Sequence, residues 1–253
     1  QTTQYSYDTH GFMIKRLVEG LEAEYFHHDA EGRLLRYTDG LNQSTQYAYG
    51  ASGLLEERRN PLGHSVAYRY DPVGRLKVLT NENHEQYRFI YDPVGRLVET
   101  SAFDDKVRRN YFDKTTGHLV KSEFEGQATH YHFDVMGNLC ERRAGEQRES
   151  FSYDINLNLV VARNAHSEYV MRYDPLGNLL EQHQRLSLFN QERHYTWQYQ
   201  YDELSNPIKT IRPDGRVVDY LRYGSGHLHG ILLDKETVAD FERDQLHREV
   251  KRS

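Results

Sequence analysis

An aromatic residue followed by aspartate, a turn and leucine recurs along the 253-residue chain, and this repeat limits the accessible folds more than any other feature. The interval between successive copies is 21 residues through the first half of the chain, and then 20, 20, 28 and 22 residues. The aspartates are Asp8, Asp29, Asp71, Asp92, Asp113, Asp134, Asp154, Asp174 and Asp202, with Gly50 and Gly224 in the same position of two divergent copies. Such a period indicates tandem units that stabilise one another.

The two most regular copies have the sequence of a type I turn followed by a glycine bulge. Asp accepts a backbone N–H two residues on, Pro sets φ at the second position, and Gly takes the left-handed fourth position. We therefore predict structural turn roles for Tyr70, Asp71, Gly74, Arg75 and Leu76, for Tyr91, Asp92, Gly95, Arg96 and Leu97, and for Tyr173, Asp174 and Gly177.

The hairpin closed by such a turn also predicts a register. Tyr70 is expected opposite Leu76, and Tyr68 opposite Val78, so that aromatic and aliphatic residues share one face. Asp71 and Arg75 are then expected on the other face. Each cross-strand pair contributes roughly 0.2 to 1 kcal/mol.

Alternation with a period of two precedes almost every one of these primary turns, as in Tyr5/Tyr7 and Tyr87/Phe89/Tyr91, which is strand periodicity. Secondary turns such as Asn60-Pro61-Leu62-Gly63 lie between the primary turns. Because short turns join only antiparallel strands, we predict an all-β fold of tandem β-hairpins in one long, curled antiparallel sheet. Residues 1–253 form a single array in this interpretation, with a longer hairpin near 182–194. Residues 234–253 are a divergent last repeat, and a helix from Val238 onward is the alternative.

Composition agrees with a thin sheet. Hydrophobic residues make up 37% of the chain, yet 20 residues are tyrosine, and the mean hydropathy is -0.86. These values favour narrow apolar stripes over a thick core. Acidic and basic residues are mixed throughout, with a net charge of -6, so no basic face for nucleic acid is expected. The longest apolar run, Leu159 to Ala162, is too short for a membrane span.

The chain offers little catalytic chemistry. Its 14 histidines include pairs such as His130 and His132, but no third ligand is spaced to complete a zinc site. Cys140 lies within a predicted strand without an activating group. The repeat aspartates are explained as turn formers, so we predict no metal, no cofactor and no enzymatic activity.

Three segments carry a family resemblance. Residues Tyr91-Asp92-Pro93-Val94-Gly95-Arg96-Leu97 and Tyr173-Asp174-Pro175-Leu176-Gly177-Asn178-Leu179 resemble the YD repeats of the RHS (rearrangement hot spot) family, and Tyr223-Gly224-Ser225-Gly226-His227-Leu228-His229 is similar to a recurring segment of bacterial RHS cores. The resemblance implies a wall segment of a partial β-cage or shell, like the cages of toxin-complex C proteins and the YD shells of teneurins. The chain has no segment that matches the self-cleaving aspartate centre found in members of the family that release their toxin.

The resemblance further implies a non-catalytic structural segment that encapsulates the C-terminal toxin of a bacterial polymorphic toxin. Its partner is then the rest of a longer RHS protein, made in the cytoplasm and exported with it; the chain opens with Gln1 in mid-repeat, as an excised fragment does. We also expect exposed edge strands at both ends, and self-association through them. The alternative function is a carbohydrate-binding or adhesion module that uses exposed aromatic stripes, with Trp197 and Tyr199 as contacts.

Overall fold

The computed structural model describes residues 1–188, 191–224 and 226–253. Every regular element in these ranges is a strand, which confirms the all-β prediction. Contacts divide the chain into unit 1, Gln1–Arg109 with Glu242–Ser253, and unit 2, Asn110–Phe241. No helix long and apolar enough to cross a membrane occurs in the described part of the chain.

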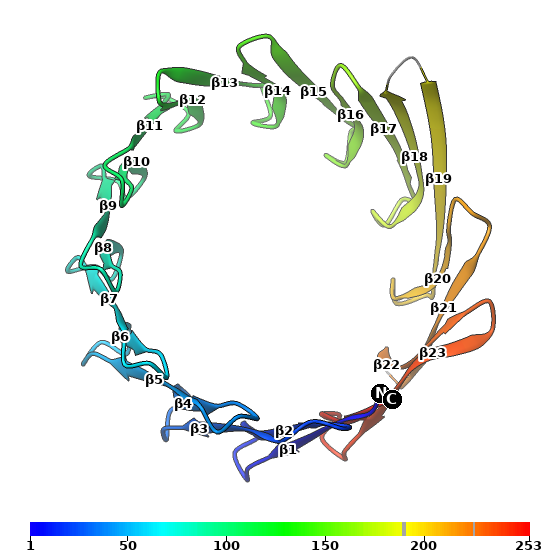
Figure 1. Ribbon diagram of the computed structural model, residues 1–253. Helices are drawn as coiled ribbons and strands as arrows, with labels where there is room; N and C mark the ends of the chain where they lie inside the picture. Colours follow the sequence, from blue (N-terminus) through cyan, green and yellow to red (C-terminus); the bar gives the residue numbers. More distant parts are fainter. Residues whose placement is uncertain (189–190, 225) are drawn as a thin grey trace. The chain divides into compact units, whose positions relative to one another are not determined.

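The strands of unit 1 pair with their chain neighbours in antiparallel fashion (Figure 1). They are β1 (Thr3–Tyr7), β2 (Met13–Val18), β3 (Glu24–His28), β4 (Leu34–Thr38), β5 (Ser44–Tyr49), β6 (Leu55–Arg59), β7 (Ser65–Tyr70), β8 (Leu76–Thr80), β9 (Gln86–Tyr91), β10 (Leu97–Ser101), β11 (Val107–Phe112) and β24 (Glu249–Arg252).

The strands of unit 2 follow the same sequential pairing. They are β12 (Leu119–Phe124), β13 (Gln127–Phe133), β14 (Leu139–Ala144), β15 (Gln147–Tyr153), β16 (Leu159–Arg163), β17 (Ser167–Tyr173), β18 (Leu179–Leu188), β19 (Gln191–Tyr201), β20 (Pro207–Ile211), β21 (Val217–Tyr223), β22 (His227–Leu233) and β23 (Glu236–Arg243). The division between the units falls within β11 and β23.

A bulge beside each regular primary turn changes the predicted register. Tyr70 pairs with Leu76 as predicted, but the register then shifts between Arg69 and Tyr70. Tyr68 therefore lies opposite Leu79, and the prediction of Val78 was wrong because it assumed an unbroken ladder. The shift recurs in other primary hairpins of both units. An extra residue in one strand bends it and increases the local twist, which accounts for the curvature of each unit's sheet (Figure 1).

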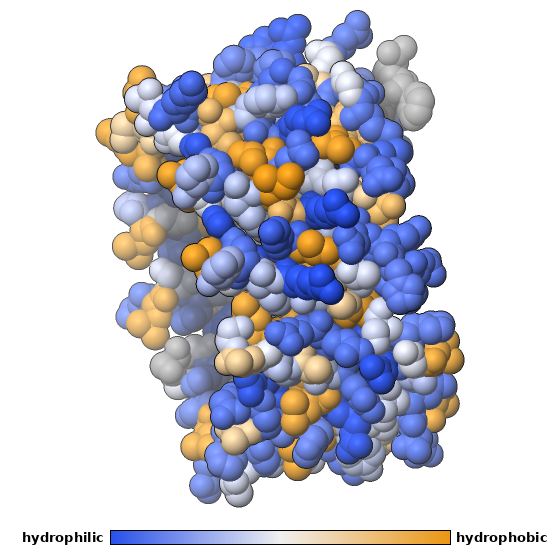
Figure 2. Space-filling view, turned by 90° about the vertical axis from the view of Figure 1, so that its left-hand side faces the viewer, coloured by the Kyte–Doolittle hydropathy of each residue, from blue (hydrophilic) through white to orange (hydrophobic). Residues whose placement is uncertain are grey.

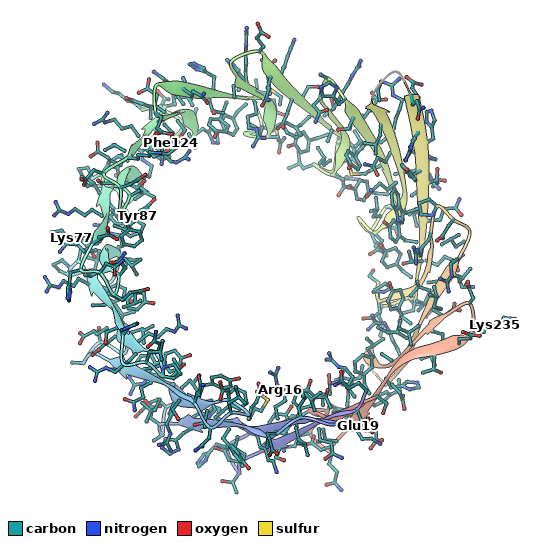
Figure 3. The ribbon with its side chains drawn as sticks, in the orientation of Figure 1. Arg16, Glu19, Lys77, Tyr87, Phe124 and Lys235 are labelled. Atoms are coloured by element: carbon teal, nitrogen blue, oxygen red, sulfur yellow. The ribbon has the colours of Figure 1, made fainter. Side chains whose placement is uncertain are left out.

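The two faces of the sheet carry different side chains. Tyr87 and Arg16 lie on the concave side of unit 1, and Lys77 lies on the convex side (Figure 3). Leu79 is directly opposite both Tyr68 and Tyr87, so these three share the concave face. The face that Figure 2 presents is largely hydrophilic, with hydrophobic residues in small groups.

No hydrophobic side chain is buried among the described residues, which agrees with the thin apolar stripes expected from composition. The buried polar residues are small: Thr45, Thr100 and Ser122. Thr100 lies opposite Phe89, so a short side chain fills the space beside an aromatic ring. The sheet is stabilised by neighbouring strands and by ring contacts rather than by a second layer.

Two segments of irregular sequence still form hairpins at the positions expected from the repeat. The interval between Asp174 and Asp202 contains the long hairpin of β18 and β19, whose positions 189 and 190 lie outside the described residues. The C-terminal segment forms β23 and β24, joined by a turn at Asp244, and no helix begins at Val238. Ser225 is also outside the described residues.

The two terminal strands are not exposed edges. Thr3 and Gln4 of β1 pair antiparallel with Arg252 and Lys251 of β24, and both chain ends lie together in unit 1 (Figure 1). The premise of the predicted edge association was therefore wrong, because the first and last strands occupy each other's hydrogen-bonding edge.

Candidate functional site: the repeat junctions and the concave aromatic face

The primary turn is organised by its aspartate. The Asp71 Oδ1 atom accepts hydrogen bonds from the backbone N–H groups of Val73 at 3.0 Å and Arg75 at 2.9 Å. The Gly74 N–H donates to the Asp71 carbonyl at 3.0 Å, and Gly74 has a φ of 84° that favours glycine. The turn of Asp92 with Gly95 and the turn of Asp174 with Gly177 make the same bonds. The aspartate thus stabilises the turn by accepting hydrogen bonds from the turn's own backbone N–H groups.

The second aspartate oxygen has a partner that differs between copies. The Arg75 Nε atom donates to Asp71 Oδ2 at 2.6 Å, and Arg96 does the same to Asp92 at 2.7 Å. In unit 2 an asparagine replaces the arginine, and the Asn178 side-chain amide donates to Asp174 Oδ2 at 2.9 Å. This bond, with two backbone N–H groups, lowers the pKa of Asp174 against the opposing effect of desolvation. Sequence reasoning missed the asparagine, although it recurs four residues after the turn aspartate in Asn138, Asn158, Asn178 and Asn206.

In several copies a junction formed by tyrosine connects a repeat to the one before it. The Tyr70 hydroxyl donates to the carbonyl of Leu55 at 2.8 Å, and the Tyr91 hydroxyl donates to the carbonyl of Leu76 at 2.9 Å. Tyr49, Tyr153, Tyr173 and Tyr201 make equivalent bonds. Burial raises the pKa of Tyr70 above its ordinary value.

Arginine takes part in the same junction in several copies. The Arg75 guanidinium carbon lies 4.7 Å from the centroid of the Tyr91 ring, within the range of a cation–π contact. Arg33 lies over the Tyr49 ring at 5.3 Å. The prediction that arginine and the aromatic residues occupy separate faces was therefore wrong, because the arginine reaches the tyrosine of the following repeat.

The copy with His28 lacks this junction, as do the copies with Phe112 and Phe133, whose rings carry no hydroxyl. His28 stands where the other copies have Tyr or Phe, and its Nδ1 atom is buried with no hydrogen-bond partner. Its ring lies 5.6 Å from that of Phe12.

In unit 1 the tyrosines Tyr49, Tyr70 and Tyr91 reach the carbonyl 15 residues earlier. For position 28 this carbonyl is that of Met13. The imidazole is too short for that bond.

The chain ends meet through the same contacts. The Tyr7 hydroxyl donates to the carbonyl of Glu249 at 2.6 Å, and the Arg248 guanidinium lies 4.7 Å from the Tyr7 ring centroid. Arg248 Nε also donates to Asp244 Oδ2 at 2.7 Å. The last repeat therefore packs on the first as consecutive repeats pack on each other.

The two residues proposed for carbohydrate contact lie on adjacent positions of one face. Trp197 and Tyr199 are both half-buried in β19, and the Trp197 ring lies 6.1 Å from that of Tyr195. Trp197 is opposite Gln182, so an amide side chain adjoins the ring. Desolvation raises the pKa of Tyr199, with a smaller effect from neighbouring phenols. Aromatic rings beside amides can stack on a sugar and bond its hydroxyls.

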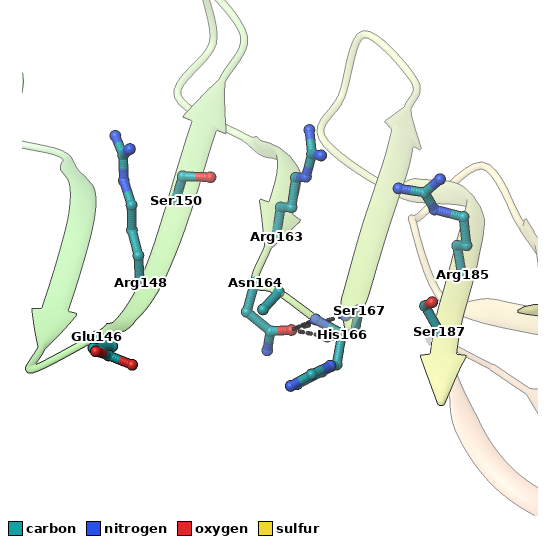
Figure 4. A pocket seen from close by; sticks show the side chains of 10 residues that line it. Glu146, Arg148, Ser150, Arg163, Asn164, His166, Ser167, Arg185 and Ser187 are labelled. Atoms are coloured by element: carbon teal, nitrogen blue, oxygen red, sulfur yellow. Dashed lines mark hydrogen bonds between the residues drawn. The ribbon is translucent and has the colours of Figure 1, made fainter. Parts of the chain in front are cut away.

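A notch of about 480 Å³ opens between the β14–β15 turn and β18. Arg148, Arg163 and Arg185 extend in the same direction along it (Figure 4). Carboxylates offset part of this charge, because Glu141 lies 2.6 Å from Arg148 and Glu168 lies 3.5 Å from Arg185. In the ranges that the structure describes, no group of three or more His, Cys, Asp or Glu residues is placed to hold a metal ion. Cys140 Sγ donates to the carbonyl of His132 at 3.2 Å.

Hairpins that repeat the Tyr-Asp turn and its tyrosine junction define the class of the fold, and the comparisons support the resemblance to the RHS/YD-repeat family. The family model of the teneurin YD-shell matches residues 1–116. The chain is 51% identical over 55 residues to double-stranded DNA deaminase toxin A of Burkholderia cenocepacia, covering 22% of this chain and 4% of that protein. It is 37% identical over 94 residues to toxin protein Tse5 of Pseudomonas aeruginosa, covering 37% of this chain and 7% of that protein. The chain thus spans a small part of these relatives.

Solved structures support the fold. The chain resembles the TcdB2-TccC3-Cdc42 crystal structure with a TM-score of 0.57 at 14% identity, covering 98% of this chain and 17% of that one. It resembles the Photorhabdus luminescens Tc holotoxin pore with a TM-score of 0.51 at 10% identity, covering 98% of this chain and 21% of that one. At such identities the likeness concerns the backbone arrangement alone.

Proposed function

We propose that this chain is a non-catalytic wall segment of an RHS shell that encloses a C-terminal toxin of the same longer polypeptide. The observation that carries the proposal is the junction in which a tyrosine hydroxyl binds the carbonyl of the preceding repeat, as Tyr70 and Tyr91 do. A junction that recurs from repeat to repeat extends a sheet without requiring a second layer. Such a sheet suits a wall.

The engagement of the repeat aspartates supports a structural role. Both carboxylate oxygens of Asp71 and Asp174 have partners within their own turns. An acid–base catalyst needs a carboxylate that can exchange a proton with a substrate. These aspartates instead hold their carboxylates in hydrogen bonds that specify the turn.

The proposed cargo follows from the relatives that the chain resembles. Two of them are toxins by name, and the chain covers only 4% and 7% of their lengths, which leaves ample chain for a further domain. The concave face carries half-buried rings such as Tyr87 and polar groups such as Arg16 (Figure 3). A mixed aromatic and polar lining contacts an enclosed polypeptide without a single strong site. In this proposal the chain is made in the cytoplasm and exported with the whole protein.

Limited proteolysis of the full-length polypeptide tests the proposal. Peptides from the region after the YD repeats are expected to resist a protease that cuts an added unstructured tag. The variant Y70A/Y91A weakens two junctions and is expected to speed cleavage of that region, whereas K77A on the convex side leaves the rate unchanged. Cleavage of the native C-terminal region as fast as of the denatured protein would refute encapsulation.

A second candidate function rests on Trp197 and Tyr199. Their position beside Gln182 on one face favours carbohydrate binding, because the rings stack and the amide bonds hydroxyls. A glycan array should then show selective binding that W197A and Y199A abolish. Y25A, which removes an exposed tyrosine of unit 1, is the control and should bind as the wild type does. Equal binding by all four proteins would remove this candidate.

A further inference from the structure

The longest hairpin of unit 2 leaves part of one strand without a second neighbour. β19 pairs with β18 from Gln191 to Gln198, whereas β20 pairs with β19 from Gln198 to Tyr201. In the described part of the chain, the residues Gln191 to Trp197 therefore have a partner strand on one side only. Figure 1 shows β19 extending beyond β20. We name Gln191 to Trp197 the free edge.

Backbone polar groups of three residues point out of the free edge. The Asp202 N–H donates to the Asn206 carbonyl at 3.0 Å, on the side of β20. Alternate residues of a strand direct their N–H and C=O groups to the same side, and the bulge beside β19 places its extra residue in β20. Glu192, His194 and Thr196 therefore direct these groups to the side that has no neighbour. An unpaired row of this kind is a template for another strand.

The free edge lacks the usual features that protect an edge strand. Protected edges are commonly very short, bulged, or supplied with Lys or Pro. The free edge contains neither Lys nor Pro, and its register with β18 is unbroken. It ends in Tyr195, Thr196 and Trp197, which are residue types that favour strands. Its composition therefore permits the addition of a strand.

We propose that the free edge binds an extended polypeptide segment by strand addition, antiparallel to β19. A polypeptide in the β conformation offers N–H and C=O groups in the alternation that the edge requires. The antiparallel direction continues the ladder that β20 forms with Gln198 to Tyr201. The added segment thus occupies the place that β20 leaves empty when the chain turns back at Arg212.

The side chains of the free edge define the segment that fits. Glu192 lies 3.8 Å from His194 on one face, and the rings of Tyr195 and Trp197 lie 6.1 Å apart on the other face, which Arg193 shares by alternation. Apolar residues are favourable opposite the two rings, an acidic residue opposite Arg193 and a basic residue opposite Glu192. The segment is therefore an alternating strand with a mixed-charge end, rather than a uniformly charged peptide.

A synthetic seven-residue peptide, VTVTEKV, serves as the probe. Aligned antiparallel from Trp197 to Gln191, it places valine opposite the two rings, glutamate opposite Arg193 and lysine opposite Glu192. Trp197 is the only tryptophan of the chain, so its fluorescence reports binding at the free edge. Titration of the whole chain with this peptide should give a saturable change in emission.

Methylation of peptide amides separates strand addition from side-chain contact. The second, fourth and sixth peptide residues lie opposite Thr196, His194 and Glu192, so their N–H groups face the free edge. A peptide methylated at these three amides should give no saturable change. The matched peptide, methylated at the third, fifth and seventh amides, should still bind. The two peptides have identical side chains and equal numbers of methyl groups.

Two variants test the same edge in the protein. H194P removes an outward N–H and should weaken binding of the unmodified peptide by about tenfold or more. H194A removes the imidazole, keeps the backbone groups and should bind as the wild type does. The His194 side chain is 68% exposed, and proline is tolerated in edge strands, so both variants should fold. Far-UV circular dichroism verifies this, and the methylated peptides decide the question on the wild type alone.

Several results would overturn the proposal. They are a titration with no saturable change, equal binding of the two methylated peptides, or equal binding of the unmodified peptide by wild type and a folded H194P. A wild type that dimerises in sedimentation velocity, while H194P stays monomeric, would also overturn it and assign the free edge to a second copy.

Discussion

Leu157 holds a backbone conformation that β-turns usually reserve for glycine. Its φ is 65°, at the turn position where Gly74 and Gly177 stand in other copies. A side chain with a Cβ in this region costs roughly 1 to 2 kcal/mol. The surrounding hairpin, with Asp154 bound to two backbone N–H groups, compensates for that cost.

Replacing Leu157 with glycine should therefore stabilise the protein. We expect L157G to raise the free energy of unfolding by about 1 kcal/mol, because the strain is removed and a half-exposed side chain loses little contact. The matched substitution G177A should lower it, since alanine then occupies a φ of 86°. Urea unfolding of both variants provides the measurement, and a destabilised L157G would contradict this assignment of strain.

The charge of the turn aspartates predicts a response to acid. The side-chain amide of Asn178 and two backbone N–H groups hold the pKa of Asp174 below its ordinary value. Because the folded pKa is lower than the unfolded value of about 3.9, the stabilisation is complete above that pH and is lost as pH falls through the folded pKa.

The variant D174N separates charge from turn formation. Asn60 already forms such a turn, with its Oδ1 accepting from Leu62 and His64, so asparagine keeps the backbone bonds. We expect wild type to be more stable than D174N at neutral pH and the difference to vanish in acid. Denaturant titrations from neutral pH to below pH 4 measure it; a difference that does not change with pH would be inconsistent with the lowered pKa.

At the scale of the element, the tyrosine junction is the bond that joins successive hairpins. Removing the Tyr70 hydroxyl leaves the Leu55 carbonyl without its donor, so Y70F should lower the free energy of unfolding by about 1 kcal/mol. Thermal or urea unfolding is the measurement. Because the ring remains, packing is preserved, and an unchanged stability would show that the bond adds nothing.

The copy in which histidine replaces the tyrosine offers the converse test. H28Y places a hydroxyl where it can reach the carbonyl of Met13 and removes the unpaired Nδ1 atom of His28. We expect a gain of about 1 kcal/mol in the same unfolding assay. A loss of stability would mean that the contact of His28 with Phe12 matters more than the junction.

Sequence reasoning predicted the local parts of these elements and missed the longer-range ones. Asp71 and Gly74 act within five residues, so turn chemistry alone predicts their roles. The partner predicted for Tyr68 was wrong because a bulge shifts the register by one residue. Strand periodicity contains no signal for such a bulge. The tyrosine junction joins Tyr70 to Leu55, which are 15 residues apart in the sequence, and it depends on that shifted register.

The contact between the chain ends shows the same limit more strongly. Tyr7 and Glu249 are 242 residues apart, and no local pattern connects them. The repeat phase did place a last hairpin at the C-terminus. The sequence thus predicted a repeat at each end of the chain. It did not predict that the last repeat packs against the first. Trp197 and Tyr199 were placed on one strand by alternation, and a glycan role for them remains a proposal.

At the scale of the whole molecule, the absence of any buried hydrophobic side chain in the described ranges distinguishes this chain from an ordinary globular domain. Stability is then distributed over many similar junctions, as in other repeat proteins. No segment should dominate the folded state. Opening of one hairpin should cost much the same as opening of another, because each exposes the same kinds of contact.

Hydrogen–deuterium exchange of the intact chain, resolved to short peptides, tests this central claim most directly. We predict moderate protection of strands in every repeat, with fast exchange at primary and secondary turns and a pattern that recurs every 21 residues through the first half of the chain. One slowly exchanging segment within an otherwise unprotected chain would contradict the account of a sheet held together repeat by repeat.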